Sequence, residues 1–168
     1  MLGGARSGKS ALAEELALGL GGERVLYVAT ALASRDPDLQ RRVRLHRERR
    51  PDGWGTLELG GGDLGQILEA AEHWRVVLLD SLSLWVSARM LEGEGEEGTL
   101  ERFDRFLEGA SALATPLVLV SDEVGLGVVP ESDAGRRFRD VLGLVNQRAA
   151  AAAEEVRLCV AGIGARIK

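Results

Sequence analysis

The sequence predicts an α/β domain in which helices cover both faces of a mainly parallel β-sheet. Four short runs are rich in Val and Leu and lack period-two alternation, which is typical of strands buried on both faces. Helical stretches separate these runs, as they do in parallel sheets. The chain has 168 residues, 45% of them hydrophobic and 28% charged. Because this length and composition suit one globular unit, we expect residues 1–168 to form a single domain.

The expected elements alternate along the chain. A helix is predicted at 9–20, where SALAEELALGL is strongly helical, and a strand follows as VLYVAT at 25–30. The other predicted strands are RVVLLDS at 75–81, PLVLVSDE at 116–123 and VRLCVAGI at 156–163. The other predicted helices are 36–49, 63–73, 83–91, 99–113 and 133–155. Between two of these helices, EGEGEEG at 92–98 is too acidic and glycine-rich to pack, and we interpret it as a mobile loop within the domain.

The composition argues against several classes of protein. A net charge of −5 gives no electrostatic reason to expect DNA or RNA as a partner. No apolar run approaches the ~20 residues that cross a bilayer, and no basic-then-apolar signal segment is present, so we expect a cytoplasmic protein without a membrane span. The single cysteine, Cys159, lies in an apolar run and is expected to be a buried, inert thiol.

Residues 3–10 read GGARSGKS and match the phosphate-binding pattern G-x-x-x-x-G-K-[ST]. In such a loop the glycines let the backbone wrap phosphates, and the N-terminus of the following helix favours an anion. We expect Lys9 to neutralise the outer phosphates and Ser10 to offer its hydroxyl to Mg²⁺. With the alternating elements, the loop predicts a phosphate-loop NTPase of the RecA-like three-layer type. The predicted nucleotide-binding residues of the loop are Gly3, Gly4, Ala5, Arg6, Ser7, Gly8, Lys9 and Ser10.

The segment before the loop is short. Phosphate-binding loops normally follow a hydrophobic strand, but only Met1 and Leu2 precede this one. Either the chain begins late, as from a misassigned start, or the fold tolerates a truncated first strand. Because the position of the loop depends on that strand, we expect truncation to weaken kinase activity more than nucleotide binding.

A second feature supports a nucleotide site. The buried run at 75–81 carries Asp80 near its end, the arrangement that places a carboxylate near Mg²⁺ beside a phosphate loop. An aspartate after an apolar strand can instead cap the next helix, and Ser81 or Ser83 can fill that role too. We predict that Asp80 and Ser10 lie on the metal side of a bound nucleotide.

Residues 41–51, RRVRLHRERRP, place His46 among six arginines. On a helix, Arg42, Arg49 and Arg50 lie close to the face of His46. A dense positive field lowers the pKa of an imidazole, which keeps it neutral and nucleophilic, and it attracts polyphosphate. Attack of a neutral histidine on an α-phosphate gives a phosphoramidate, a known covalent strategy. A surface histidine on a basic helix is the other interpretation of this segment.

Taken in order, the motifs resemble those of one enzyme family over nearly the whole chain. They are GGARSGKS, LYVAT, HRERRPDGW, LLDSLSLWVS, DEVGLGVVP, RRFRDVLGLVNQRAAAAAEEV and AGIGARIK, and they span residues 3–168. The family is that of the bifunctional adenosylcobinamide kinase / adenosylcobinamide-phosphate guanylyltransferases. Phosphate loops are common, whereas EVG-G-VP followed by FRD-x-x-G-x-x-NQ is specific to this family.

The resemblance implies two reactions of cobalamin assembly. ATP or GTP phosphorylates the aminopropanol hydroxyl of adenosylcobinamide. GMP then passes from GTP to that phosphate through a histidine–GMP intermediate, which gives adenosylcobinamide-GDP and pyrophosphate. The family histidine falls on His46, so the implied catalytic residues are His46 and Lys9. The resemblance also implies Mg²⁺, a small-molecule corrinoid substrate and a homo-oligomer, with a trimer suggested.

Other family positions carry over individually. Glu58 matches an acidic position, and a carboxylate there can accept hydrogen bonds from the N1–H and amino group of guanine, which adenine cannot offer. Glu123 matches a family position within the EVG motif. Its carboxylate either belongs to the site or caps the loop that follows. The chain departs from the family at Ala88 and Asp122, where asparagines are expected, so any contacts of those amides are lost or altered. The implied nucleotide-binding residues beyond the loop are Thr30, Ala31, Leu32, Arg47, Glu48, Arg49, Arg50, Glu58 and Asp80.

Two other functions are compatible with these residues. One is a small-molecule kinase without nucleotidyl transfer, in which His46 is a surface residue. The other is a nucleotide-dependent switch that hydrolyses GTP slowly and forms no corrinoid product. Labelling of the protein by α-labelled GTP, stable to alkali and labile to acid, is expected only from the guanylyltransferase.

Overall fold

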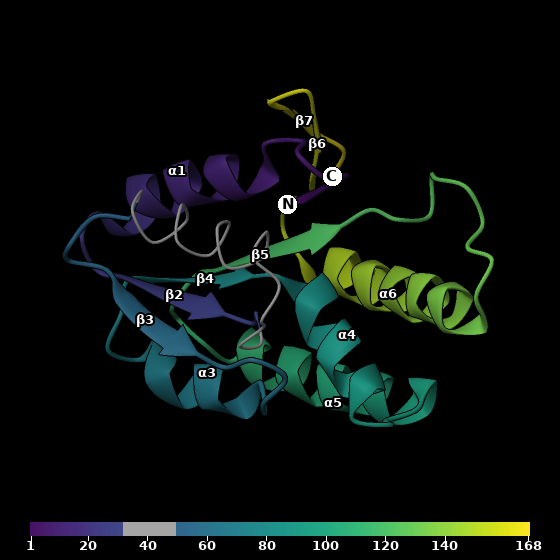
Figure 1. Cartoon of the computed structure of the whole chain (residues 1–168). Helices are drawn as coiled ribbons and strands as arrows, with labels where there is room; N and C mark the ends of the chain where they lie inside the picture. The colour runs from purple at the N-terminus through teal and green to yellow at the C-terminus, as the bar shows by residue number, and fades with distance from the viewer. Residues whose placement is uncertain (32–49) are drawn as a thin grey trace.

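The structure is a computed structural model that describes residues 1–31 and 50–168. The predicted helix at 36–49 lies outside these residues. A β-sheet forms the middle layer of the molecule (Figure 1). One face is covered by α1 (Lys9–Gly21), and the other face is covered by α3 (Gly65–Ala71), α4 (Leu82–Leu91), α5 (Glu96–Ser111) and α6 (Asp133–Ala152).

The described residues form one seven-stranded sheet in the order β3-β2-β4-β5-β1-β6-β7. All neighbouring strands are parallel except the antiparallel pair β6 and β7. The order places β1, which leads into the phosphate loop, beside β5, and it places β4 on the other side of β5. The strands are β1 (Leu2–Gly3), β2 (Val25–Ala29), β3 (Gly55–Glu58), β4 (Val76–Asp80), β5 (Leu117–Asp122), β6 (Arg157–Val160) and β7 (Ile163–Arg166).

The structure confirms an α/β fold with a mostly parallel sheet. Strands β2, β4 and β5 fall inside the predicted runs at 25–30, 75–81 and 116–123. The first four residues of both β2 and β4 are buried, because helices cover both faces of the sheet there. Helices α1, α3, α4, α5 and α6 also lie within a few residues of their predicted bounds.

The prediction of one strand at 156–163 is wrong, because these residues form parts of a hairpin. Ala161 and Gly162 have φ values of 51° and 81°, and two successive positive φ values characterise the type I′ turn of a two-residue hairpin. The chain therefore reverses between β6 and β7, which pair antiparallel. Val160 and Ile163 are 62% and 71% exposed, so the apolar run does not form a strand buried on both faces.

One strand was not predicted, whereas the first strand is short, as expected. Strand β3 was not predicted, because GTLE is short and its burial alternates at the edge of the sheet. The first strand, expected to be truncated, is the two-residue strand β1. It joins the two parts of the sheet, because Leu2 pairs with Ser121 of β5 on one side and with Leu158 of β6 on the other.

The acidic segment 92–98 is mostly exposed, as expected of a segment that does not pack, but its last three residues are helical. Helix α5 begins at Glu96, so only residues 92–95 connect α4 to α5. Arg102 Nε donates a hydrogen bond to Glu94 Oε1 at 2.6 Å, and Arg89 forms an ion pair with Glu92. Arginines on the adjoining helices therefore bind two carboxylates of this exposed segment.

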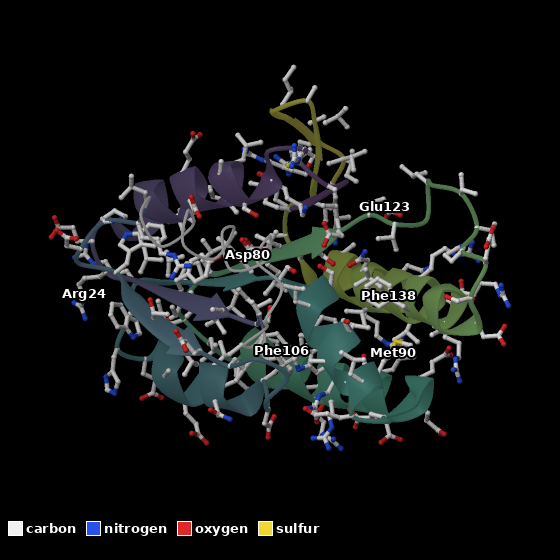
Figure 2. All side chains as sticks on the ribbon, in the orientation of Figure 1. Arg24, Asp80, Met90, Phe106, Glu123 and Phe138 are labelled. Atoms are coloured by element: carbon white, nitrogen blue, oxygen red, sulfur yellow. The ribbon has the colours of Figure 1, made fainter. Side chains whose placement is uncertain are left out.

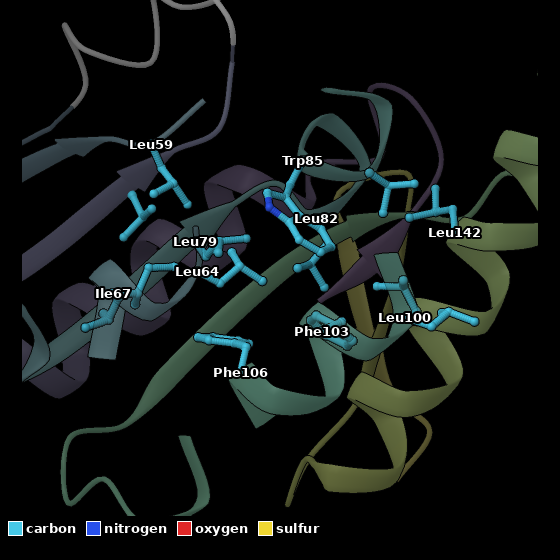
Figure 3. Close-up of a cluster of buried hydrophobic side chains, with 14 of the residues drawn as sticks. Leu59, Leu64, Ile67, Leu79, Leu82, Trp85, Leu100, Phe103, Phe106 and Leu142 are labelled. Carbon is cyan, nitrogen blue, oxygen red and sulfur yellow. The ribbon is translucent and has the colours of Figure 1, made fainter. Parts of the chain in front are cut away.

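The hydrophobic core lies on both sides of the sheet. The larger cluster, under α3, α4, α5 and α6, contains Trp85 and Phe103, whose ring centroids are 6.1 Å apart (Figure 3). Trp85 is fully buried, and its Nε1 donates to the carbonyl oxygen of Gly62 at 3.1 Å. The smaller cluster lies under α1 and includes Tyr27. Cys159 is buried with a free thiol, as predicted. No helix in the described part of the chain is both long and apolar enough to cross a bilayer.

Candidate functional site

The phosphate loop connects β1 directly to α1. Its turn depends on two positive φ values, 59° at Arg6 and 90° at Gly8. The backbone N–H of Ser7 donates to the carbonyl oxygen of Gly4 at 3.2 Å, which closes the turn. Within the described residues, no side chain caps the N-terminus of α1. The first N–H groups of α1 and the positive end of its dipole are therefore left for an anion.

The β6–β7 hairpin supports the loop. The backbone N–H of Gly162, in the hairpin turn, donates to the carbonyl oxygen of Ser7 at 2.9 Å. A Cβ atom at Gly8 would lie 3.0 Å from Gly162 Cα, and a Cβ atom at Gly3 would lie 2.6 Å from the carbonyl oxygen of Cys159. Both glycines are thus needed for close backbone approach. The sequence prediction missed this support because it treated the hairpin as one strand.

Lys9 is held inside the loop by two contacts. Its Nζ donates to the carbonyl oxygen of Gly4 at 3.2 Å and lies 2.6 Å from Asp122 Oδ1, and the side chain is 11% exposed. Ser83 Oγ donates to the second carboxylate oxygen of Asp122, and Ser81 Oγ lies 2.7 Å from Ser83 Oγ. Asp122 stands where the resemblance predicts an asparagine, and its charge provides an ion pair that an amide does not.

Asp80, labelled in Figure 2, ends β4, and its carboxylate contacts Tyr27. Tyr27 Oη donates to Asp80 Oδ2 at 3.0 Å. Burial, with a further contribution from the charge of Asp80, raises the pKa of Tyr27 well above its usual value, so the phenol stays protonated and donates. Among the described residues, Asp80 Oδ1 has no hydrogen-bond or ion-pair partner. The cap of α4 is Ser81, whose Oγ accepts from Leu84 N, so Asp80 does not serve as that cap.

Arg50 lies over the face of the Tyr27 ring. The guanidinium carbon of Arg50 is 3.3 Å from the centroid of the Tyr27 ring, and Arg50 Nη1 donates to Thr56 Oγ1 at 3.4 Å. Arg50 is the first described residue after position 31. Five predicted site residues lie outside the described residues and stay predictions: Leu32, His46, Arg47, Glu48 and Arg49.

The parallel register brings other predicted residues to one edge of the sheet. Glu58 and Asp80 both pair with Ala29, from opposite sides of β2. With two strand spacings between them, their backbones are roughly 10 Å apart. Thr30 is fully buried, and its Oγ1 bonds both the N–H and the carbonyl oxygen of Ser81 at 2.7 Å. Because β1 is parallel to these strands, the phosphate loop leaves from the same edge, and Ala31 lies there as well.

The structure shows the contacts of two other positions named from the sequence, Glu123 and Ala88. Glu123 Oε1 accepts from the N–H of Gly125 at 2.7 Å, which matches the loop-capping interpretation of this residue. Ala88 is buried in α4, and a Cβ atom at Gly61 would lie 2.6 Å from the Ala88 side chain. This small residue therefore packs against the chain after β3, where an asparagine was expected from the family.

Among the described residues, acidic and metal-ligating side chains do not mark the site as a metal cluster. The described residues contain no group of three or more His, Cys, Asp and Glu side chains placed to hold a metal ion. A cavity of about 750 Å³ runs along β5 between α1, α5 and α6, and includes Leu117, Ser121 and Asn146 in its lining. None of the described site residues lines it.

Comparison with known proteins agrees with the motifs. Residues 1–167 match the family described as cobinamide kinase / cobinamide phosphate guanyltransferase. The chain is 41% identical over 168 residues to the bifunctional adenosylcobalamin biosynthesis protein CobP of Pseudomonas aeruginosa, covering 100% of this chain and 95% of that protein. It is 40% and 37% identical over 180 residues to the CobU proteins of Escherichia coli and Salmonella typhimurium, covering 99% of this chain and 97% of each relative.

Proposed function

The chain belongs to the cobinamide kinase / cobinamide phosphate guanyltransferase family, and on that basis we propose that both reactions use the nucleotide site built on its phosphate loop. It is a bifunctional enzyme of cobalamin biosynthesis that acts as a kinase and as a nucleotidyltransferase. The main support for one shared nucleotide site is the phosphate loop. There Lys9 lies at the N-terminus of α1, which no described side chain caps.

We assign the domain to the RecA-like class of phosphate-loop NTPases and treat residues 1–168 as one catalytic domain. The strand order supports this assignment, since β5 lies between β1 and the strand that ends at Asp80. We further propose a cytoplasmic homotrimer. A corrinoid is bulky, and a domain of this size offers an open groove more easily between subunits than within one.

In the kinase reaction, the terminal hydroxyl of the aminopropanol arm of adenosylcobinamide attacks the γ-phosphorus of ATP or GTP. A new P–O bond forms, the bond to the β–γ bridging oxygen breaks, and the nucleoside diphosphate leaves. The protein contributes position and charge rather than covalent chemistry. Lys9 and the backbone N–H groups from Gly4 to Ser10 bind the phosphates and neutralise the charge that develops on them.

Asp80 at the end of β4 and Ser10 at the end of the loop fit Mg²⁺. Asp80 offers Oδ1, which has no partner among the described residues, and Ser10 offers a hydroxyl in the first turn of α1. Mg²⁺ in nucleotide sites takes one or two protein ligands, while phosphates and water supply the rest. When bound, the ion neutralises phosphate charge and orients the triphosphate. We therefore propose Ser10 and Asp80 as the protein residues on its side.

In the guanylyltransferase reaction, His46 is the proposed nucleophile. A neutral imidazole nitrogen attacks the α-phosphorus of GTP, a P–N bond forms and pyrophosphate leaves. A phosphate oxygen of adenosylcobinamide phosphate then attacks the same phosphorus, the P–N bond breaks, and adenosylcobinamide-GDP forms. The support for His46 is its match to the family position and the arginines around it in the sequence.

The remaining nucleotide contacts are proposed from the sheet edge. Glu58 is exposed at the end of β3 and can accept hydrogen bonds from guanine. The hydroxyl of Thr30 is already bonded to Ser81, so we propose that Thr30 contacts the nucleotide through its main chain. The other proposed contacts are Ala31, Leu32, Arg47, Glu48, Arg49 and Arg50.

Intact-protein mass spectrometry after incubation with GTP and Mg²⁺ tests this proposal. The wild-type protein should gain one GMP, stable to alkali and labile to acid. His46→Ala should gain none, while still phosphorylating adenosylcobinamide with ATP. Lys9→Ala should weaken both reactions, because each uses the triphosphate. His73→Ala replaces the second of the two histidines and is the matched control, with labelling expected as in wild type.

The result that contradicts a histidine nucleophile is GMP on the His46→Ala protein. Equal loss of both reactions in that variant would mean that His46 positions nucleotide instead. Full GMP transfer by Lys9→Ala would exclude a site shared by the two reactions.

A further inference from the structure

Three side chains from different parts of the chain form a continuous contact beside the proposed metal side. Asp80 ends β4, Tyr27 lies in the middle of β2, and Arg50 precedes β3. Tyr27 Oη donates to Asp80 Oδ2 at 3.0 Å, and the guanidinium of Arg50 lies 3.3 Å from the centre of the Tyr27 ring. The tyrosine thus contacts the carboxylate through its hydroxyl and the arginine through its ring face.

Tyr27 is well placed to hold both neighbours in position. Its side chain is 3% exposed and packs in the cluster under α1, so its position is determined by the core. A hydrogen bond to Oδ2 selects one orientation of the Asp80 carboxylate and leaves Oδ1 for another ligand. A guanidinium over an aromatic ring is favoured by the charge distribution of the ring and by the planar shape of both groups.

Within the described residues, the guanidinium of Arg50 has one other polar contact. Its Nη1 reaches Thr56 Oγ1 only at 3.4 Å, near the limit for a hydrogen bond. Its Nε is buried without a hydrogen-bond partner in the described part of the chain. Of the two contacts that the described residues give this guanidinium, the ring of Tyr27 is the closer one.

We propose that Tyr27 is a positioning residue that orients Asp80 through its hydroxyl and Arg50 through its ring. One buried side chain then sets the relative position of the metal-side carboxylate and the nucleotide-binding guanidinium. This rests on the proposed function, in which Asp80 lies on the metal side and Arg50 binds nucleotide. Nucleotide transfer needs the metal side of the triphosphate and the nucleotide-binding arginine to stay in a fixed relation. A shared support for Asp80 and Arg50 keeps the distance between these two side chains constant.

Two substitutions separate the two contacts of Tyr27. Tyr27→Phe removes the hydroxyl and keeps the ring, whereas Tyr27→Leu removes both. The probes are Mn²⁺ binding to the protein–GTP complex, followed by electron paramagnetic resonance, and the rate of GMP labelling at saturating Mn²⁺. Asp80→Asn serves as the reference for a lost carboxylate and Arg50→Lys for a lost guanidinium plane. Thr115→Val, which removes a hydroxyl hydrogen bond to Ala71 before β5, is the matched control.

We expect Tyr27→Phe to weaken Mn²⁺ binding by about tenfold, the size of effect seen when a hydrogen-bond partner of a metal ligand is removed. Tyr27→Leu should show the same weakening and, in addition, label more slowly than Tyr27→Phe at saturating Mn²⁺, as Arg50→Lys does. Thr115→Val should bind Mn²⁺ as wild type does. Melting temperatures identify any variant that has lost its fold, and the conservative Tyr27→Phe carries the test if Tyr27→Leu has unfolded.

Wild-type Mn²⁺ affinity in Tyr27→Phe, with affinity lost in Asp80→Asn, would overturn the proposal and leave the metal-side role of Asp80 intact. Wild-type Mn²⁺ affinity in Asp80→Asn would overturn the metal-side role itself, and the proposal with it. Equal labelling rates in Tyr27→Phe and Tyr27→Leu would overturn the role of the ring.

Discussion

Replacing Gly8 by alanine tests whether the phosphate loop depends on the backbone contacts described above. Gly8 has φ of 90°, where an L-residue is strained by roughly 1–2 kcal/mol. The new Cβ would also lie 3.0 Å from Gly162 Cα, and a backbone atom can yield only by moving the hairpin turn. Gly19→Ala is the matched control, because Gly19 is exposed within α1 and a Cβ atom there meets nothing within 4 Å.

The two substitutions should have opposite effects on stability. Gly8→Ala should lower the free energy of unfolding by about 1–2 kcal/mol or more, whereas Gly19→Ala should raise it by about 0.5–1 kcal/mol, the gain of alanine over glycine within a helix. For a domain of this size, 1 kcal/mol shifts the melting temperature by about 2–4 °C, so the two variants should differ by about 3–12 °C. Thermal unfolding followed by circular dichroism measures this difference.

Binding of a fluorescent GTP analogue gives the second readout. If the loop of Gly8→Ala relieves the strain by leaving its binding geometry, the affinity for the GTP analogue should fall by about 5- to 30-fold, the equivalent of about 1–2 kcal/mol. Gly19→Ala should bind as wild type does. A Gly8→Ala protein that melts with or above Gly19→Ala would refute the reasoning, because it would show that neither the φ value nor the Gly162 contact constrains the loop.

Two further predictions concern stability. Phe103→Ala should lower the free energy of unfolding by about 3–5 kcal/mol, because it leaves a cavity beside Trp85 in the core; urea unfolding measures this, and a loss below about 1 kcal/mol would contradict the packing. Because the pKa of Tyr27 is raised in the folded state, its stabilising effect should be complete below about pH 10 and decline above it. Urea unfolding across that range should show that the free energy of unfolding falls more steeply with pH for wild type than for Tyr27→Phe. Since Tyr27 is the single tyrosine, absorbance follows its ionisation directly. Parallel pH profiles of the two proteins would contradict the raised pKa.

The sequence determined those features that depend on local pattern. Runs of Val and Leu require burial on both faces, so β2, β4 and β5 follow from their composition. The spacing of Gly3, Gly8 and Lys9 likewise predicts the loop before α1, and Gly8 supplies the positive φ that the turn needs. The failures were also local. Strand β3 is too short and too exposed to give such a pattern, and the apolar run at 156–163 concealed a turn at Ala161 and Gly162.

Only the tertiary structure decided which polar groups meet. Tyr27 and Asp80 are 53 residues apart, yet the register of β2 against β4 brings hydroxyl and carboxylate together. Lys9 meets Asp122 because β1 and β5 are neighbours in the sheet, although the sequence identified Asp122 only as a departure from the family. Burial of apolar residues can be read from a single run, because it depends on that run alone. Pairing of polar groups depends on strand order and register, which the whole chain determines together.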